Sequence, residues 1–547
     1  MIDVTSLSNR RATARWNRVA VGDMVERLTW SYPDQEAFVG WAGAFAYPEH
    51  ERVTYRQANT IANKLANALL AAGCSGKDRV LMVCENSVEA VIGKLGVMKA
   101  GLVVAPVNPS LAGDVVEDVI KRIEPRLAIV DAEVWPKVQA AFARAGMSVA
   151  VTIPIGGDVI AGSHGLREFI APAPDQEPDV EIHGDDICEL QFTSGTTAMP
   201  KAVMLSHTNA YFAASGYALT LARGTRSESE LRLQSFLPLV YHIGGQIFAL
   251  PVLLAGGTLV VGRRPVADQV AQSIVRDRIT TLWGGSPVMI QAWIEAMQRL
   301  GLTAPHLHVI VYGWAAISPT QLAAIKALTT DQVTTVEIFG QTEAIACHRF
   351  WPHKWPETFE ANCPAHNYVG VPSPLLASHV MDEDGRSLEG QPRVVGEAVY
   401  RSPVVMQGYY KDPAATELAF QHGWFHSGDS CVYDEAGLRI MVDRKKDIVK
   451  TGGENVSSLR VEAVLVQHPG VVRAAVIGLP DPRWGEAVTA VVMKKPGAAP
   501  VDEAELIQFC RAKLAGFETP KRVIFVESYP ETVGGKIMKH VLRANLK

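Results

Sequence analysis

A stretch at residues 193–205, TSGTTAMPKAVML, carries the residue types that bind phosphate. Its four leading hydroxyl side chains can donate hydrogen bonds, its glycine lets backbone N–H groups approach an anion, and Lys201 adds a positive charge. It follows the apolar run ICELQF, which predicts a strand, and α/β proteins bind ligands where strands end. It is not a Walker loop, because Pro200 stands where that motif has glycine. We expect a phosphate site, with an ordinary polar turn as the alternative.

Four later segments add further chemistry. FGQTEA, residues 339–344, combines an aromatic ring, a glycine, a hydroxyl and a carboxylate. GWFHSGD ends in Asp429, and DRKKDIVKTGGENV follows with Arg444 and a glycine pair. VGGKIMKHVLR supplies Lys536 near the C-terminus.

In this order and at these spacings, the five segments resemble the motifs of the adenylate-forming superfamily, which includes acyl-CoA synthetases, nonribosomal-peptide adenylation domains and luciferases. The resemblance extends from about residue 54 to residue 543. In that superfamily a carboxylate attacks the α-phosphate of Mg·ATP, which gives acyl-AMP and pyrophosphate, and a thiol then displaces AMP. The C-terminal domain rotates between the two half-reactions. The resemblance therefore implies an acid–thiol ligase that uses ATP, coenzyme A and Mg²⁺.

The resemblance also implies a nucleotide site. The phosphate loop would hold the β- and γ-phosphates, Phe339 and the segment 313–316 would pack on adenine, and Thr342 would contact the α-phosphate. Asp429 would accept hydrogen bonds from the ribose hydroxyls, with Arg444 nearby. The full implied set is Thr193, Ser194, Gly195, Thr196, Thr197, Lys201, Gly313, Ala315, Phe339, Thr342, Asp429 and Arg444.

Five further roles follow from the same resemblance. Lys536 would stabilise the charge that develops during adenylation. Glu343 would help to hold Mg²⁺, and Gly453 would line the passage for the incoming thiol. His242 would gate the acyl pocket, and Lys446 falls at the hinge position.

The acyl pocket that these motifs imply includes Tyr241, His242 and Trp314. Trp314 stands where the family commonly has glycine, so its indole would reshape the pocket wall. Amino-acid adenylators carry an acidic residue near the stretch LPLVYHIGGQ, and this chain has none there. We therefore expect a hydrophobic or bulky carboxylic acid, with CoA as the acceptor in preference to a carrier protein.

The phosphate loop departs from the family at Ala198 and Ala202, where glycine is usual. An alanine in a left-handed conformation costs roughly 1–2 kcal/mol, and a methyl group inside the cradle would displace the polyphosphate from its donors. Losing one well-placed donor lowers a rate about a hundredfold or more. Because only adenylation uses the β- and γ-phosphates, we hypothesise that adenylation is weak or absent.

Under this hypothesis the chain acts mainly as a thioesterification enzyme on acyl-AMP that a separate adenylating enzyme supplies. Two alternatives stay open. One is an ordinary two-step ATP-dependent acyl-CoA synthetase. The other is a non-catalytic protein that binds acyl-adenylate or nucleotide.

The elements that must position these residues follow an α/β pattern. Residues 79–132 alternate short apolar strands with helical periodicity, including a helix after Asn86 as its expected cap, which predicts parallel sheet covered by helices. We expect a large N-terminal domain of mixed sheets flanked by helices, with a small β-rich subdomain at 373–442, and a smaller α+β C-terminal domain on a hinge. The expected domains are residues 1–443 and 444–547.

Composition excludes several classes of protein. The chain has 547 residues, 48% of them hydrophobic, and a net charge of −5, which argues against nucleic acid as a partner. The N-terminus lacks the apolar core of a signal peptide, and the longest apolar run is interrupted by Pro251, so we expect no membrane span. Seven scattered cysteines favour a reducing cytoplasm.

Overall fold

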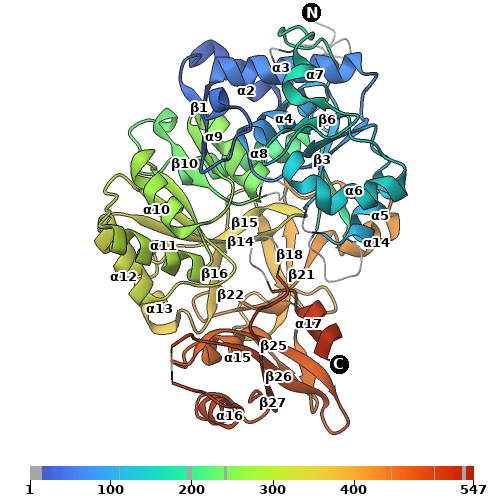
Figure 1. Cartoon of the computed structure of the whole chain (residues 1–547). Helices are drawn as coiled ribbons and strands as arrows, with labels where there is room; N and C mark the ends of the chain where they lie inside the picture. Colours follow the sequence, from blue (N-terminus) through green and yellow to red (C-terminus); the bar gives the residue numbers. More distant parts are fainter. Residues whose placement is uncertain are drawn as a thin grey trace, which may run out of the picture.

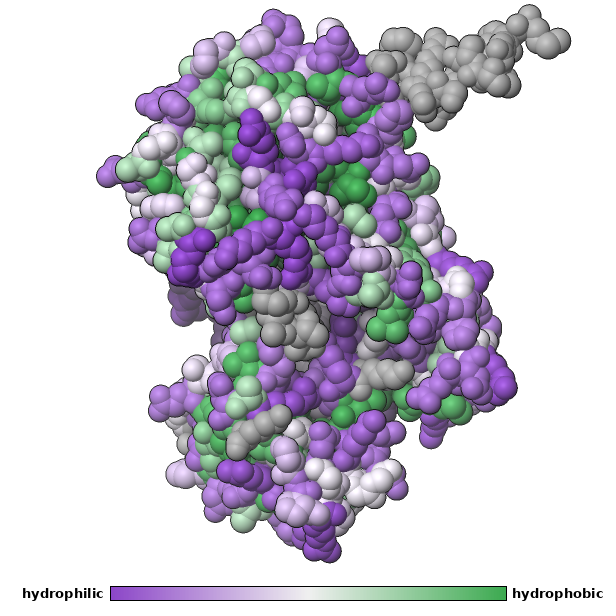
Figure 2. Space-filling model, turned by 90° about the vertical axis from the view of Figure 1, so that its right-hand side faces the viewer, coloured by the Kyte–Doolittle hydropathy of each residue, from purple (hydrophilic) through white to green (hydrophobic). Residues whose placement is uncertain are grey.

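The structure is a computed structural model that describes residues 15–546, apart from residues 16, 110, 194–199, 239–242, 445, 498 and 532–536. Figure 1 shows a large body and, below it, a smaller lobe formed by the C-terminal elements in orange and red. In the side view of Figure 2 the outline narrows between these two parts. The expected α/β class, with a large N-terminal part and a smaller C-terminal one, is confirmed.

An eight-stranded sheet carries the strands that flank the phosphate loop. β8 pairs with β4 in parallel and with β9 in antiparallel fashion, so the loop is the connection of a β8–β9 hairpin. In spatial order the strands are β19 (Gly408–Tyr409), β9 (Ala202–Ser206), β8 (Ile187–Phe192), β4 (Val103–Pro106), β3 (Arg79–Val83), β5 (Leu127–Asp131), β6 (Val151–Ile153) and β7 (His164–Gly165).

A fourteen-stranded sheet carries the remaining motifs of the body. The region 373–442, expected as a separate subdomain, contributes antiparallel strands that continue this sheet through the pairing of β16 with β22. The order is β17 (Ala377–Met381), β18 (Gly396–Arg401), β21 (Trp424–Tyr433), β22 (Arg439–Arg444), β16 (Asn367–Pro372), β15 (Ala344–Phe350), β14 (Thr334–Gln341), β13 (Val309–Tyr312), β12 (Thr281–Gly285), β10 (Arg232–Ser235), β11 (Thr258–Gly262), β1 (Glu36–Trp41) and β2 (Arg52–Thr54), with β20 (Phe420–Gln421) beside β21.

Helices cover the faces of both sheets (Figure 1). Those of the body are α2 (Asp23–Ser31), α3 (Tyr55–Ala71), α4 (Val88–Lys99), α5 (Gly113–Ile123), α6 (Trp135–Ala145), α7 (Leu166–Ile170), α8 (His207–Leu221), the π-helix η5 (Ile243–Ala249), α9 (Leu250–Ala255), α10 (Ala267–Arg276), α11 (Pro287–Leu300), α12 (Pro319–Leu328), α13 (Pro356–Asn362) and α14 (Pro413–Ala419). Within the described residues, every helix is too short or too polar to span a lipid bilayer.

The start of α4 differs from the expectation by one residue. Ser87, not Asn86, caps the helix, because its hydroxyl accepts a hydrogen bond from the Ala90 N–H. The Asn86 amide instead donates to the carbonyls of Leu237 and Gly262, each at 3.0 Å. Asn86 therefore ties the first sheet to the second.

The smaller lobe has its own sheet and core. It contains β23 (Val449–Thr451), β24 (Glu454–Val456), β25 (Val471–Asp481), β26 (Gly485–Lys494) and β27 (Arg522–Phe525), with the helices α15 (Ser458–Leu465), α16 (Glu503–Arg511) and α17 (Lys539–Leu546). The sheet assignment changes between Arg444 and Val449, close to the predicted domain boundary. The boundary itself stays a prediction.

Candidate active site

A cavity with a volume of about 1440 Å³ lies between the body and the smaller lobe. Its wall combines the expected nucleotide segments of the body with residues 537–540 of the lobe. Of the implied nucleotide set it contains Thr193, Lys201, Gly313, Ala315, Phe339, Thr342 and Arg444.

The two ends of the phosphate loop are held together. The Thr193 N–H donates to the Lys201 carbonyl at 3.0 Å, and the Lys201 N–H donates to the Thr193 hydroxyl at 3.3 Å. The Lys201 ammonium lies 4.4 Å from the centre of the Tyr409 ring, a cation–π contact that keeps the charge at the cavity wall. Ser194, Gly195, Thr196, Thr197 and Ala198 lie outside the described residues.

Ala202 does not crowd the phosphate site, which corrects the expectation for this residue. It is the first residue of β9, pairs with Phe192 across the hairpin, and has a backbone φ outside the left-handed region. Its side chain is 1% exposed and belongs to an apolar cluster under the sheet. The steric argument therefore depends on Ala198 alone.

Thr342 and Glu343 lie in the turn between β14 and β15, and both line the cavity. Glu343 accepts a hydrogen bond of 2.9 Å from the Tyr409 hydroxyl, and burial raises the pKa of the Glu343 carboxyl. Mg²⁺ in nucleotide sites typically binds one or two carboxylates together with water and substrate phosphates. The Glu343 carboxylate lies on the cavity wall and shares the contact residue Tyr409 with Lys201, so it fits that ion.

The two segments that are expected to pack on adenine lie close together near the end of β13. A Cβ at Gly313 would meet the Ile338 carbonyl at 2.9 Å, so glycine is needed where the two strands approach. Phe339 lines the cavity and stacks on His348 with ring centres 6.0 Å apart. Trp314 also lines the cavity and has a φ of +69°, a left-handed conformation that costs a non-glycine residue roughly 1–2 kcal/mol.

Asp429 and Arg444 face each other across β21 and β22 and form an ion pair of 2.6 Å. Asp429 is fully buried and is not among the described residues that line the cavity, whereas Arg444 is. The Asp429 carboxylate raises the pKa of Arg444. In this arrangement Asp429 orients the guanidinium, and the carboxylate that was expected to meet the ribose is paired with Arg444.

Contacts across the hinge give a structural reason for the serine pair at 457 and 458. The Ser457 hydroxyl donates to the Val442 carbonyl at 2.6 Å and accepts from the Arg460 N–H, so it both caps α15 and docks it. The N–H and hydroxyl of Ser458 each donate to Asp443 at 2.6 Å. These bonds join the end of the body to the lobe on either side of Lys446.

Lys446 and Gly453 occupy different surroundings. Lys446 lines the cavity, and burial together with Arg444 lowers the pKa of its ammonium. Gly453 lies in the β23–β24 turn with a φ of +87°, and among the described residues no atom lies within 4 Å of a Cβ built there. It is not among the described residues of the cavity wall, so this orientation of the lobe keeps the expected thiol passage away from the cavity.

Three further expected residues lie outside the described part of the chain: Tyr241, His242 and Lys536. The residues that directly follow Lys536 are described. Ile537 lines the cavity and forms a bridge with Glu531, and the Met538 N–H donates to the Pro530 carbonyl at 2.8 Å. These contacts hold residues 530–531 and 537–538 together, and Ile537 and Met538 line the cavity.

Glu337 is a cavity residue that the sequence analysis missed. It is 2% exposed, and its Oε2 has no hydrogen-bond partner among the described residues. Burial raises the pKa of the Glu337 carboxyl well above its usual range. The signal in the sequence was an acid inside the apolar strand VEIF, two residues before Phe339.

We expect Glu337→Gln to stabilise the protein increasingly as the pH rises from 5 to 8. Between the usual carboxyl pKa and the raised one, the folded wild type binds a proton that the unfolded chain has lost, so its stability falls with pH by at most about 1.4 kcal/mol per pH unit. Glutamine does not titrate. The difference in stability between the variant and the wild type at each pH is measured from thermal midpoints at one scan rate. Glu360→Gln, at an exposed position, is the matched control. A pH-independent difference between variant and wild type would contradict the prediction.

Sequence comparison matches residues 26–410 to the AMP-binding enzyme family and residues 460–536 to the AMP-binding enzyme C-terminal domain. The long-chain-fatty-acid–CoA ligase FadD13 of Mycobacterium tuberculosis is 32% identical over 494 residues, which cover 90% of this chain and 93% of that protein. A feruloyl-CoA synthase of Amycolatopsis sp. is 31% identical over 502 residues, with the same coverage of 90% and 93%.

Solved structures agree with these relatives. ATP-bound MatB from Rhodopseudomonas palustris superposes with a TM-score of 0.80 at 28% identity and covers 97% of this chain and 99% of its own. The anthranilate CoA ligase AuaEII, in complex with anthranoyl-AMP, has a TM-score of 0.83 at 24% identity, covering 96% and 97%, and supports the fold. The chain therefore belongs to the adenylate-forming family of AMP-binding enzymes and is an acid–thiol ligase of the acyl-CoA synthetase type.

Proposed function

We propose that the chain converts a hydrophobic carboxylic acid into its CoA thioester through an acyl-AMP intermediate. One observation carries the proposal: the wall of one cavity combines polar groups suited to a nucleotide with apolar side chains suited to an acyl group. The polar groups include Lys201, Thr342, Glu343 and Arg444.

The apolar residues of the cavity wall favour a hydrophobic acid as the substrate. They include Tyr217, Leu237, Ile247, Trp283 and Trp314, none of which carries a charge at neutral pH. An ammonium group would need an acidic partner here. The relatives are named for different acids, namely long-chain fatty, ferulic and 4-hydroxybutyric acids, so their names do not select one.

In the adenylation half, Lys201 and the phosphate loop would bind the polyphosphate, and Thr342 and Arg444 would orient the α-phosphate and ribose side. Glu343 would hold Mg²⁺, which neutralises phosphate charge when bound. Thioesterification would follow after the lobe turns and brings Gly453 to the cavity. CoA is the acceptor that we propose, and AMP leaves.

The finer proposal is that adenylation is the weaker half-reaction. The chain would then form acyl-CoA faster when a separate enzyme supplies the acyl-AMP. Ala198 supports it, since a methyl group there would crowd the β- and γ-phosphates. Ala202 does not, because its side chain packs in the core.

Three measurements test both proposals: acyl-CoA formation from acid, ATP and CoA; acyl-CoA formation from acyl-AMP and CoA; and ATP–pyrophosphate exchange. The ligase proposal expects product from acyl-AMP with at least one hydrophobic acid. The finer proposal expects Ala198→Gly to raise pyrophosphate exchange about tenfold or more without changing the acyl-AMP reaction. Equal wild-type rates from both mixtures would contradict it and favour an ordinary two-step synthetase.

The non-catalytic alternative makes a different prediction. A protein that only binds acyl-adenylate would form a complex in calorimetry and give no acyl-CoA from acyl-AMP and CoA by mass spectrometry. The cavity-facing carboxylate of Glu343 and the paired Arg444 favour catalysis, because a passive binding site does not need a metal-binding carboxylate.

A further inference from the structure

A second cavity of about 270 Å³ adjoins the large cavity beside the apolar residues that are proposed to bind the acyl group. Leu237, Trp283 and Trp314 line both cavities. The other residues that line the second cavity are the apolar Phe236, Pro238, Pro265 and Met289 and the charged Glu85, Arg263 and Arg264. The two cavities are thus separated by a wall to which these three shared side chains contribute.

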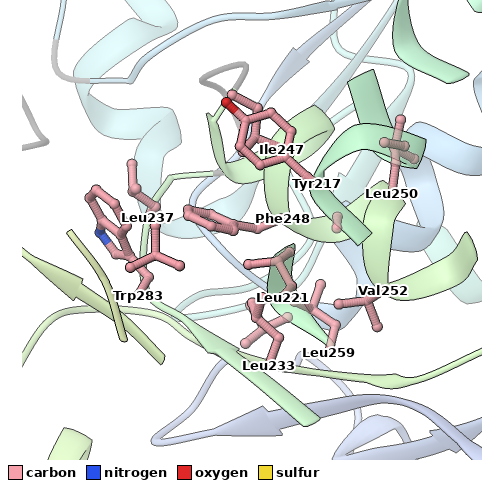
Figure 3. Packing of buried hydrophobic residues seen from close by; sticks show 14 of the residues in the cluster. Tyr217, Leu221, Leu233, Leu237, Ile247, Phe248, Leu250, Val252, Leu259 and Trp283 are labelled. Atoms are coloured by element: carbon pink, nitrogen blue, oxygen red, sulfur yellow. The ribbon is translucent and has the colours of Figure 1, made fainter. Parts of the chain in front are cut away.

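Two of the three shared residues belong to the core. Trp283 is 1% exposed and packs on Phe248 with ring centres 5.3 Å apart. Figure 3 shows Trp283 and Leu237 beside Phe248, which extends from η5 toward them among the other buried side chains. Truncating Trp283 or Leu237 would therefore create a cavity in the hydrophobic core as well as in the wall between the two cavities.

Trp314 differs from these two residues, because it contacts the core but is itself partly exposed. Its side chain is 38% exposed, and its ring packs edge-on against Trp283 at 90°, with ring centres 5.3 Å apart. Its left-handed backbone is one that glycine adopts without strain. A bulky side chain kept in an unfavourable conformation at a ligand cavity points to a function of that side chain.

We propose that Trp314 is the partition that ends the acyl site, so that the chain accepts compact, ring-sized hydrophobic acids and excludes long-chain ones. The inference rests on the proposed function, since it names the substrate class of that site. The aromatic groups at this end, Tyr217, Trp283 and Trp314, favour a flat ring through edge and face contacts. The second cavity is the space that a longer acyl chain would enter if the indole were absent.

The test is the Trp314→Gly variant, because glycine removes the partition and suits the backbone. Cinnamate represents compact acids and dodecanoate represents long ones. Wild type is expected to prefer cinnamate, and Trp314→Gly is expected to raise the dodecanoate-to-cinnamate ratio of kcat/KM about tenfold or more. Trp314→Phe keeps a ring and the same backbone strain, so its ratio is expected to stay within about threefold of wild type.

A wild type that uses both acids equally, or a ratio unchanged in Trp314→Gly, would overturn the partition. Failure of the proposed function is separable. If wild type forms no acyl-CoA from any acid, calorimetry with non-hydrolysable acyl-sulfamoyl adenosines still tests the partition. The dodecanoyl analogue should then bind more tightly to Trp314→Gly than to wild type, with the cinnamoyl analogue as reference, and equal binding would overturn the inference.

Discussion

Asp429→Asn is expected to lower kcat/KM for ATP about 100-fold, which corresponds to about 2.7 kcal/mol of lost transition-state stabilisation. The substitution removes the carboxylate that holds Arg444 through a 2.6 Å ion pair in a buried setting. Charge-assisted bonds of this kind are stronger than neutral ones, and asparagine cannot replace the charge. Arg444 would then lose its fixed position on the cavity wall.

A double-mutant cycle separates two ways in which Asp429 could act. If it acts through Arg444, Asp429→Asn should cost little in an Arg444→Gln background, and the two losses will not add. If it accepts hydrogen bonds from the ribose, as the resemblance implies, a large loss will persist in that background. The structure favours the first result, because Asp429 is fully buried and pairs with Arg444, which lines the cavity.

The matched control is Asp23→Asn. Asp23 pairs with Arg18 at 2.8 Å, and both side chains are buried. This variant should lower the thermal midpoint without changing kcat/KM, because neither residue lines the cavity. A kcat/KM for Asp429→Asn within about fivefold of wild type would show that the ion pair does not support ATP use.

Strands and motifs were predictable from the sequence, whereas the surroundings of individual side chains were not. Short apolar runs such as ICELQF and HVIVY became β8 and β13 because period and length identify a buried strand. Ala202 shows the limit: the family resemblance implied that its methyl group, in place of glycine, would crowd the phosphates. The β8–β9 pairing turns its methyl group into the core instead. Successive side chains in a strand point to opposite faces of the sheet. A shift of one residue in register therefore moves a side chain from one face to the other.

Other features of the site depend on tertiary contacts, which the sequence does not reveal. In the sequence Glu337 resembles any other strand residue, and only the structure shows that it lines the cavity with an Oε2 that has no hydrogen-bond partner within the described part of the chain. The serine pair at 457 and 458 had no explanation in the sequence, because its partners, Val442 and Asp443, belong to the end of the body. Such contacts join segments whose proximity depends on the orientation of the lobe.

Lys536→Ala is expected to lower ATP–pyrophosphate exchange about 100- to 1000-fold, the usual effect of removing a group that stabilises developing charge. Thioester formation from preformed acyl-AMP should stay within about fivefold of wild type, since no pyrophosphate is formed in that step. Its neighbour Ile537 lies on the cavity wall, and the Lys539–Glu462 ion pair of 2.7 Å anchors the segment that follows. Lys513→Ala, at an exposed position of the same lobe, is the matched control.

The selectivity of this effect follows from the orientation of the lobe. In the structure the lobe presents residues 537–540 to the cavity, while Gly453 is not among the described residues of the cavity wall. A rotation that brings Gly453 to the cavity must break the bonds from Ser457 and Ser458 to the end of the body and carry Lys536 away. Lys536 can then serve one half-reaction only. If Lys536→Ala slows both half-reactions equally, one orientation of the lobe serves both steps, and the alternation that we expect for this chain is wrong.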